Sequence, residues 1–317
     1  MSEQREKRAP DLSVRIAGLR LRNPVIAASG TFGYGGEYGG LIDVSRLGAI
    51  CTKGLTLKPR QGNSGIRIWE SPAGLLNSIG LENPGIPAFI EQELPRLRKL
   101  GPAVIANLSG ATVEEYAEGA ALLNDSSVDM IELNISCPNV KAGGMAFGLD
   151  PAAAASVVGP VRRACGGKPL MVKLSPNAPD LAAVARFCVN AGADALSLVN
   201  TFKAMAIDIK NRKPVFDNVS AGLSGPAVRP IALRMVWELY DALRTPGKAK
   251  KPAVPIVGIG GIARAEDALE FLMAGASAVQ TGSATFAHPA AMPEIIDGIE
   301  EYMRSAGIAG VENISIR

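Results

Sequence analysis

Eight short runs of mostly apolar residues recur along the chain, and stretches with helical spacing separate them. Each run is nearly continuous in apolar residues, as a strand buried on both faces must be. The runs span residues 24–29, 48–54, 104–110, 130–136, 170–176, 195–201, 255–261 and 278–283. This alternation predicts an α/β fold, a (β/α)8 TIM barrel in which residues 1–317 form a single domain.

The segments around these runs complete the predicted barrel. Residues 180–192 and 263–276 have helical spacing and end at or beside a glycine, which is typical of a helix C-terminus. Residues 12–24 predict a short N-terminal β-hairpin that closes the bottom of the barrel. Long connections follow the second and sixth runs, on the C-terminal face where the active sites of such barrels lie. Because long loops inside a compact domain are usually functional, we expect both to contribute to a site.

Composition and charge narrow the classes of function. The net charge is +3 and aromatic residues make up 5% of the chain, with Lys and Arg scattered, which does not suit a nucleic-acid surface. Residues 1–12 are charged, unlike a signal peptide, and no run reaches the roughly 18 apolar residues of a membrane helix. We therefore expect a cytoplasmic protein with no nucleic-acid or membrane partner.

Cysteine and histidine content limits the chemistry further. No two of Cys51, Cys137, Cys165 and Cys188 form a CxxC pair, so this chain alone offers no metal or iron–sulfur ligand set. His288 is the single histidine and reads as a loop residue before a helix, which excludes any mechanism that needs two histidines. Cys165 and Cys188 fall in helical segments and are interpreted as buried structural residues.

Polar side chains gather at the C-terminal ends of the predicted strands. A lone asparagine at such a position is most often a turn or cap residue, but a whole set describes a cavity lined with hydrogen-bond donors and two cations. Such a cavity suits a flat, polar, partly anionic ligand or a ring with imide groups. The residues are Ser29, Lys53, Asn107, Asn134, Cys137, Asn139, Lys173, Asn200 and Thr201.

The ends of the last two predicted strands carry small residues. Gly260 and Gly261 follow one strand, and Gly282 and Ser283 follow the next. A glycine pair alone is often just a tight turn, but two such ends on the final strands of a barrel favour a phosphate site. With Lys173 as a cation for the N1/O2 edge of a flavin, they predict flavin mononucleotide (FMN). The alternative for Lys173 is a side chain that extends from the barrel rim into solvent.

Cys137 lies in a predicted loop at the same face, directly before Pro138 and Asn139. Without a nearby histidine it cannot be half of a Cys–His nucleophile. Its thiolate can instead act as a general base that takes a proton from a carbon beside a carbonyl. Together with a flavin that accepts hydride, this base would oxidise a C–C bond to C=C.

Several motifs together resemble the dihydroorotate dehydrogenase family over residues 12 to about 300. They are NISCPNV, SPAGLLNSIGLENPG, VKLSPN, LVNT and GIGGI. Two further segments, SGTFGYGGEYGG and PNVKAGGMAFGLDP, resemble the catalytic subunit of the class 1B enzymes. In that family class 2 members use a serine base and carry an N-terminal extension, whereas this chain has Cys137 and its charged first twelve residues do not predict such an extension. Class 1A members, which use fumarate, differ in both of these segments.

The resemblance implies a role for each candidate residue. Cys137 would take the C5 proton of dihydroorotate while hydride leaves C6 for the flavin. The implied substrate contacts are Lys53, Asn77, Ser78, Ile79, Gly80, Leu81, Asn134, Asn200 and Thr201. The implied FMN contacts are Ser29, Lys53, Gly54, Asn107, Asn134, Lys173 and Val199, with Gly225, Gly260, Gly261, Gly282 and Ser283 at the phosphate. No metal site is implied.

The resemblance also implies a partner. In class 1B enzymes a second subunit carries FAD and a [2Fe–2S] cluster and passes electrons to NAD⁺, and the expected assembly is a homodimer within a heterotetramer. One alternative is a class 1A-like enzyme, and another is a different FMN-dependent pyrimidine oxidoreductase of the dihydropyrimidine dehydrogenase or tRNA-dihydrouridine synthase kind. The tRNA enzyme would need a basic RNA-binding surface, which the sequence does not indicate. A non-enzymatic phosphate-binding barrel is the remaining alternative.

Overall fold

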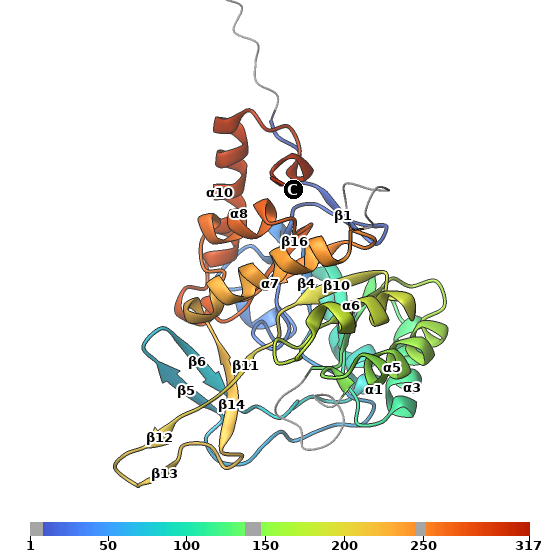
Figure 1. Cartoon of the computed structure of the whole chain (residues 1–317), viewed down its shortest axis with the longest axis vertical. Coiled ribbons are helices and arrows are strands. Elements are labelled where there is room, and N and C mark those ends of the chain that lie inside the picture. The colour runs from blue at the N-terminus through green and yellow to red at the C-terminus, as the bar shows by residue number, and fades with distance from the viewer. Residues whose placement is uncertain (1–8, 137–146, 245–251) are drawn as a thin grey trace, which may run out of the picture.

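A closed barrel of eight parallel strands forms the centre of the chain (Figure 1). The computed structural model describes residues 9–136, 147–244 and 252–317. Around the barrel the strands keep their order along the chain, and the last pairs with the first. They are β3 (Val25–Ala27), β4 (Ala49–Cys51), β7 (Ala103–Leu108), β8 (Met130–Asn134), β9 (Leu170–Lys173), β10 (Ala195–Leu198), β15 (Ile256–Ile259) and β16 (Ala278–Thr281). Each lies within one of the eight predicted runs or overlaps it, so the predicted (β/α)8 barrel is confirmed.

Helices surround the barrel. They are α1 (Ile86–Ala88), α2 (Leu94–Lys99), α3 (Val113–Asn124), α5 (Pro151–Ala164), α6 (Leu181–Asn190), α7 (Arg229–Ala242), α8 (Ala265–Met273), α9 (Ala284–Ala287) and α10 (Ala291–Ala306). A π-helical turn, η3 (Phe89–Glu93), joins α1 to α2, and single 3-10 turns are η1 (Gly36–Tyr38), η2 (Val44–Arg46), η4 (Pro226–Val228) and η5 (Val311–Asn313).

The helix ends follow the sequence signals. Asp150 and Asp180 cap α5 and α6, because each side chain accepts a hydrogen bond from a backbone N–H in the first turn, at 2.8 Å in both cases. Gly192 and Gly275 follow the C-caps of α6 and α8 with φ of 109° and 104°. Glycine adopts these angles without the steric cost that other residues meet. The two helix ends predicted from glycine are therefore confirmed.

A β-hairpin closes the N-terminal end of the barrel. Strands β1 (Val14–Ile16) and β2 (Leu19–Leu21) pair antiparallel. Ile16 and Leu21 are almost fully buried and pack in one apolar cluster with Met130 and Met171 from the barrel interior. The predicted hairpin and its place at the bottom of the barrel are therefore confirmed.

The two long connections form a second sheet at the opposite end (Figure 1). Its order is β11-β14-β6-β5, and all its neighbours are antiparallel. The strands are β5 (Ile68–Ser71), β6 (Gly74–Asn77), β11 (Phe202–Met205) and β14 (Ser220–Ser224), with a small hairpin of β12 (Ile207–Asp208) and β13 (Lys213–Pro214) beyond them. The sequence predicted only long loops here. These strands were missed because they are short and mostly half-exposed, so they lack the apolar runs of the barrel strands.

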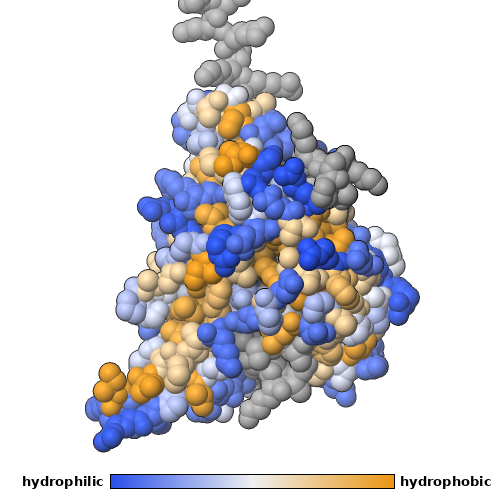
Figure 2. Space-filling model, in the orientation of Figure 1, coloured by the Kyte–Doolittle hydropathy of each residue, from blue (hydrophilic) through white to orange (hydrophobic). Residues whose placement is uncertain are grey.

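Exposed apolar side chains lie on this sheet and on the small hairpin beyond it. Ile207 in β12 and Ile209 just after it are 59% and 87% exposed, and Ile68 of β5 is 50% exposed. Figure 2 shows hydrophobic side chains at the lower left of the molecule, where Figure 1 places β12 and β13. In the described part of the chain, no helix combines the length and the apolar character needed to cross a membrane.

Candidate active site

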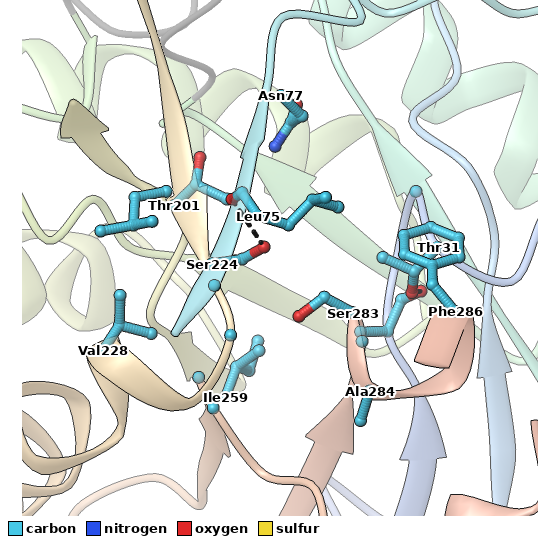
Figure 3. Close-up of a pocket in the computed structure, with 18 of the residues that line it drawn as sticks. Thr31, Leu75, Asn77, Thr201, Ser224, Val228, Ile259, Ser283, Ala284 and Phe286 are labelled. Atoms are coloured by element: carbon cyan, nitrogen blue, oxygen red, sulfur yellow. Dashed lines mark hydrogen bonds between the residues drawn. The ribbon is translucent and has the colours of Figure 1, made fainter. Parts of the chain in front are cut away.

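A cavity of about 730 Å³ lies at the C-terminal end of the barrel, between the ends of the barrel strands and the four-stranded sheet. Figure 3 shows Asn77, Thr201 and Ser224 at one side of it and Ser283 and Phe286 at the other. The cavity brings together most of the residues that the sequence singled out. These are Ser29, Lys53, Gly54, Asn77, Ile79, Gly80, Leu81, Asn107, Asn134, Lys173, Val199, Asn200, Thr201, Gly225, Gly260, Gly261, Gly282 and Ser283.

Among the described candidate residues, Ser78 is not one of those that line the cavity. Ser78 is 2% exposed, and its hydroxyl accepts hydrogen bonds from the amides of Asn63 at 3.1 Å and Asn218 at 3.3 Å. It therefore braces the segment that carries Asn77 and Ile79. Cys137 and Asn139 lie outside the described residues, which end at Ser136 before this gap.

Hydrogen bonds join two asparagines, Asn134 and Asn200, to each other and to Ser136 at the floor of the cavity. The Asn200 amide donates to the Asn134 Oδ1 atom at 3.2 Å and to the Ser136 hydroxyl at 2.8 Å. Asn134 Oδ1 also accepts from the backbone N–H of Ser136 at 3.2 Å. Because these bonds link the ends of β8 and β10, they fix the orientation of both amides. They also hold the residue that directly precedes Cys137 in the sequence against the cavity floor.

A buried ion pair lies directly below this floor. The Lys173 ammonium group is 3.8 Å from Glu132 Oε1, and the two side chains are 7% and 0% exposed. Burial alone would raise the pKa of Glu132, but the charge of Lys173 and hydrogen bonds from Gln280 and Ser197 outweigh it and hold that pKa below its usual value. Glu132 is therefore an ionised partner for the one lysine at the bottom of the cavity.

The rim of the cavity carries the second predicted cation. Lys53 Nζ is 3.7 Å from Glu82 Oε2, which also accepts a hydrogen bond from Arg67 at 2.9 Å. Gly80 and Leu81, between β6 and Glu82, both have left-handed backbone angles, with φ of 78° and 59°. For leucine this conformation is unfavourable, so the surrounding contacts of the loop must hold it in place.

Close backbone approach explains the glycines at the far end of the cavity. Gly261 has φ of 72°, and a Cβ there would lie 2.8 Å from the carbonyl oxygen of Gly225. Gly225 has φ of 101°, and its own Cβ would lie 2.7 Å from Gly74 Cα. The turns after β14 and β15 therefore pack backbone against backbone, and Gly225 and Gly261 line the cavity there without a side chain. Such a lining suits a phosphate group.

The structure adds residues that sequence reasoning missed. Thr31, Ser224 and Phe286 line the cavity, and so does His288, which the sequence placed only in a loop. The Nε2 atom of His288 is 2.8 Å from Glu294 Oε2. The buried carboxylate of Glu132 is the largest omission. A carboxylate among the apolar residues Met130, Ile131 and Leu133 of β8 was the available signal.

Comparison with known proteins agrees with this geometry. The family model described as dihydroorotate dehydrogenase matches residues 11–303. The chain belongs to the dihydroorotate dehydrogenase family. A relative from Petrotoga mobilis is 55% identical over 96% of this chain and 98% of its own length, and it is named dihydroorotate dehydrogenase B (NAD(+)), catalytic subunit. Relatives with the same name from Geotalea daltonii and Pelobacter propionicus are 55% and 53% identical, each over 96% of this chain and 97% of their own length.

Enzymes of the dihydroorotate dehydrogenase family are flavoproteins, and the cavity of this member fits a flavin. Its volume, about 730 Å³, falls within the range of small-molecule sites, about 300–1,000 Å³. The buried ammonium of Lys173 faces it from below, and the backbone turns at Gly225 and Gly261 form a cradle at one end. Among the described residues no group of three or more His, Cys, Asp and Glu side chains is arranged to hold a metal ion.

Proposed function

We propose that this chain oxidises dihydroorotate to orotate with FMN as its bound cofactor, and that it acts as the catalytic subunit of a class 1B enzyme within a single barrel domain. The observation that carries the proposal is the cavity itself. It joins a buried Lys173, the linked amides of Asn134 and Asn200, and closely packed glycine turns at one end that would cradle a phosphate. Membership of the dihydroorotate dehydrogenase family supports the choice of substrate.

FMN would be held along the length of the cavity. Gly225, Gly260, Gly261, Gly282 and Ser283 would hold its phosphate, and Ser29, Gly54, Asn107, Lys173 and Val199 would line its ring. A side chain at Gly54 would displace two of the lining residues, because a Cβ there would lie 3.1 Å from Asn107 Oδ1 and 2.9 Å from Leu81 Cδ2. Bound in this way, FMN would supply the acceptor for the hydride that leaves C6 of the substrate.

Polar side chains above the ring would hold the substrate. Asn77, Asn134 and Asn200 offer amide donors and acceptors that match the imide groups of a pyrimidine ring. Lys53 supplies a positive charge at the rim for the substrate carboxylate, and Thr201 adds a hydroxyl donor. Ile79, Gly80 and Leu81 would contact the substrate, with Ser78 supporting them from behind. Because Asn134 and Asn200 are already fixed by hydrogen bonds to each other and to Ser136, their orientation needs little change on binding.

Cys137 would remove the C5 proton. It follows Ser136 in the chain, and Ser136 is hydrogen-bonded to both floor asparagines. The thiolate would accept the proton from C5 and bound FMN would supply the acceptor for the hydride from C6, so that a C5=C6 double bond forms and the cysteine becomes a thiol. The name of the relatives, catalytic subunit, supports a partner for this chain. We propose that the partner carries FAD and a [2Fe–2S] cluster and passes the electrons to NAD⁺, in a heterotetramer built on a dimer of this chain.

Anaerobic titration of the purified chain with dihydroorotate tests the proposal. The chain is expected to carry yellow flavin, to release FMN on denaturation, and to bleach on addition of dihydroorotate as orotate forms. Dihydrouracil, which lacks the carboxylate, is the matched control ligand and should bleach it far more slowly. A chain that holds no flavin, or that is bleached equally by both compounds, would contradict the proposal.

A further inference from the structure

A polar layer crosses the interior of the barrel just below the cavity, and its centre is Glu132. The residue projects inward from β8, between Met130 below it and Asn134 above it, in keeping with the alternation of side chains along a strand. Its carboxylate accepts hydrogen bonds from four side chains on four other strands. These are Asn107 Nδ2 at 2.7 Å, Gln280 Nε2 at 2.7 Å, Ser197 Oγ at 2.9 Å and Cys51 Sγ at 3.3 Å.

Glu132 reaches the cavity only through its neighbours. It is fully buried and does not line the cavity, whereas Asn107 and Lys173 touch both Glu132 and the cavity. Below it lies the apolar cluster that includes Met130, Met171 and Ile105. An ionised carboxylate in such surroundings is costly unless it is paired and hydrogen-bonded, and this one is both. It lies beneath the two residues that face the proposed flavin ring and contacts both of them, which an apolar side chain at this position could not do through hydrogen bonds or charge.

We propose that Glu132 is a positioning residue that fixes Lys173 and Asn107 beneath the flavin and offsets part of the lysine charge, so that the reduced flavin is not held too tightly. This inference rests on the proposed function. Lys173 stabilises the negative charge that a reduced flavin carries, and the carboxylate behind it opposes that effect. The pair thus sets the flavin reduction potential low enough for electrons to move on to a distant acceptor.

Glu132→Gln is the decisive variant, because it removes the negative charge and nearly preserves the shape. Gln280 makes the substitution tolerable. Its Oε1 atom is buried with no hydrogen-bond partner among the described residues, so rotation of this amide lets it accept from the new Gln side chain. The flavin reduction potential is measured by equilibrium with a redox dye, in the absence of dihydroorotate. The potential is expected to rise, with at least a tenfold gain in the affinity for reduced relative to oxidised flavin, which is about 30 mV for a two-electron couple.

Two further variants separate charge from structure. Ser197→Ala removes one hydrogen bond to the same carboxylate without changing any charge, so its potential should stay close to that of the unaltered chain. If Glu132→Gln does not fold, the comparison of Lys173→Met with the double variant Lys173→Met/Glu132→Gln replaces it. The double variant removes both members of the buried pair, and it should have the higher potential of the two.

An unchanged or lowered potential in Glu132→Gln, or an equal rise in Ser197→Ala, would overturn the inference. The two proposals fail in different ways. A chain without flavin, or with flavin that dihydroorotate does not bleach, contradicts the proposed function. A chain that passes that test but keeps its potential in Glu132→Gln contradicts only the role of Glu132.

Discussion

Among the four thiols of the chain, only Cys137 is proposed to act on the substrate. Cys165 and Cys188 are fully buried, and burial raises their pKa values to about 11 and about 12. Burial and the charge of Glu132 raise the pKa of Cys51 as well. These three thiols therefore stay protonated near neutral pH and cannot act as bases.

Cys137→Ala should slow the reductive half-reaction with dihydroorotate by roughly 10²–10⁴-fold, the usual contribution of a general base, and should leave flavin content unchanged. Stopped-flow bleaching of the flavin measures the rate. Cys188→Ala is the control, because it removes a thiol that is buried in α6 and should leave that rate unaltered. Full speed in Cys137→Ala across the pH range would refute the assignment.

Single residues also show where sequence reasoning reaches its limit. The polar strand ends at Lys173, Asn134 and Asn200 could be predicted, because parallel strands of a barrel end at one face. The role of Glu132 could not. Its four hydrogen-bond donors come from positions 51, 107, 197 and 280, and only the closed barrel brings them to one point.

At the scale of elements, the turn after β15 should be intolerant of any side chain. In Gly261→Ala the new Cβ would lie 2.7 Å from Arg229 Cβ and 2.8 Å from the Gly225 oxygen, at a φ of 72°. Relief requires the two turns to separate, which distorts the proposed phosphate cradle. The dissociation constant for FMN should rise by about tenfold or more, the result of losing about 1.4 kcal/mol. Gly167→Ala, with open space around its Cβ, is the control, and similar FMN affinity in both variants would exclude the cradle.

The β1–β2 hairpin, at the end of the barrel opposite the cavity, should contribute to stability and not to catalysis. Leu21 is 1% exposed in the apolar cluster that fills the bottom of the barrel. Leu21→Ala should lower the free energy of unfolding by about 2–5 kcal/mol, because it removes buried methyl groups and leaves a cavity. Urea denaturation measures this loss, and Leu41→Ala, at a side chain 63% exposed, should show almost none. A changed rate of flavin bleaching in folded Leu21→Ala would show that the two ends of the barrel are coupled.

The sheet over the cavity is the element that the sequence did not reveal. It depends on pairs such as Asn77 with Gly222, which are far apart in the chain. A Cβ at Gly222 would lie 2.2 Å from the Thr201 hydroxyl, so the close contact between these strands and the proposed substrate site also depends on tertiary structure. Continuous apolar runs reveal strands that are buried on both faces. Neither face of these strands is completely buried, so their sequences carry no such run.

In the whole molecule, one end of the barrel contributes mainly to stability and the other end holds the proposed active site. Apolar contacts of the hairpin close one end, and the polar layer around Glu132 separates that core from the cavity at the other. A flavin seated there would lie close to the face formed by the two long connections. Electron transfer from a flavin to an acceptor outside the chain requires a short distance between the two. A partner that carries the acceptor should therefore dock near the cavity.

The last prediction concerns the route of those electrons. The chain has no complete GxGxxG motif of a dinucleotide-binding unit, because the GIGGIA segment that begins at Gly258 has Ala263 in place of the third glycine and its strand, β15, belongs to the closed barrel. Its four cysteines offer no CxxC pair for an iron–sulfur cluster. The isolated chain is therefore expected to oxidise dihydroorotate with an artificial dye and to form NADH only when the proposed FAD and [2Fe–2S] subunit is added.

Absorbance of NADH, followed with dihydroorotate and NAD⁺ in the presence and absence of that subunit, measures this directly. Dye reduction by the same preparation is the control for an active flavin site. Rapid NADH formation by the chain alone would contradict the class 1B assignment, because the electrons would then need no partner. Rapid reduction of fumarate by the chain alone would identify a class 1A-like enzyme. In such an enzyme fumarate would enter the same cavity as dihydroorotate and take the electrons directly from the flavin.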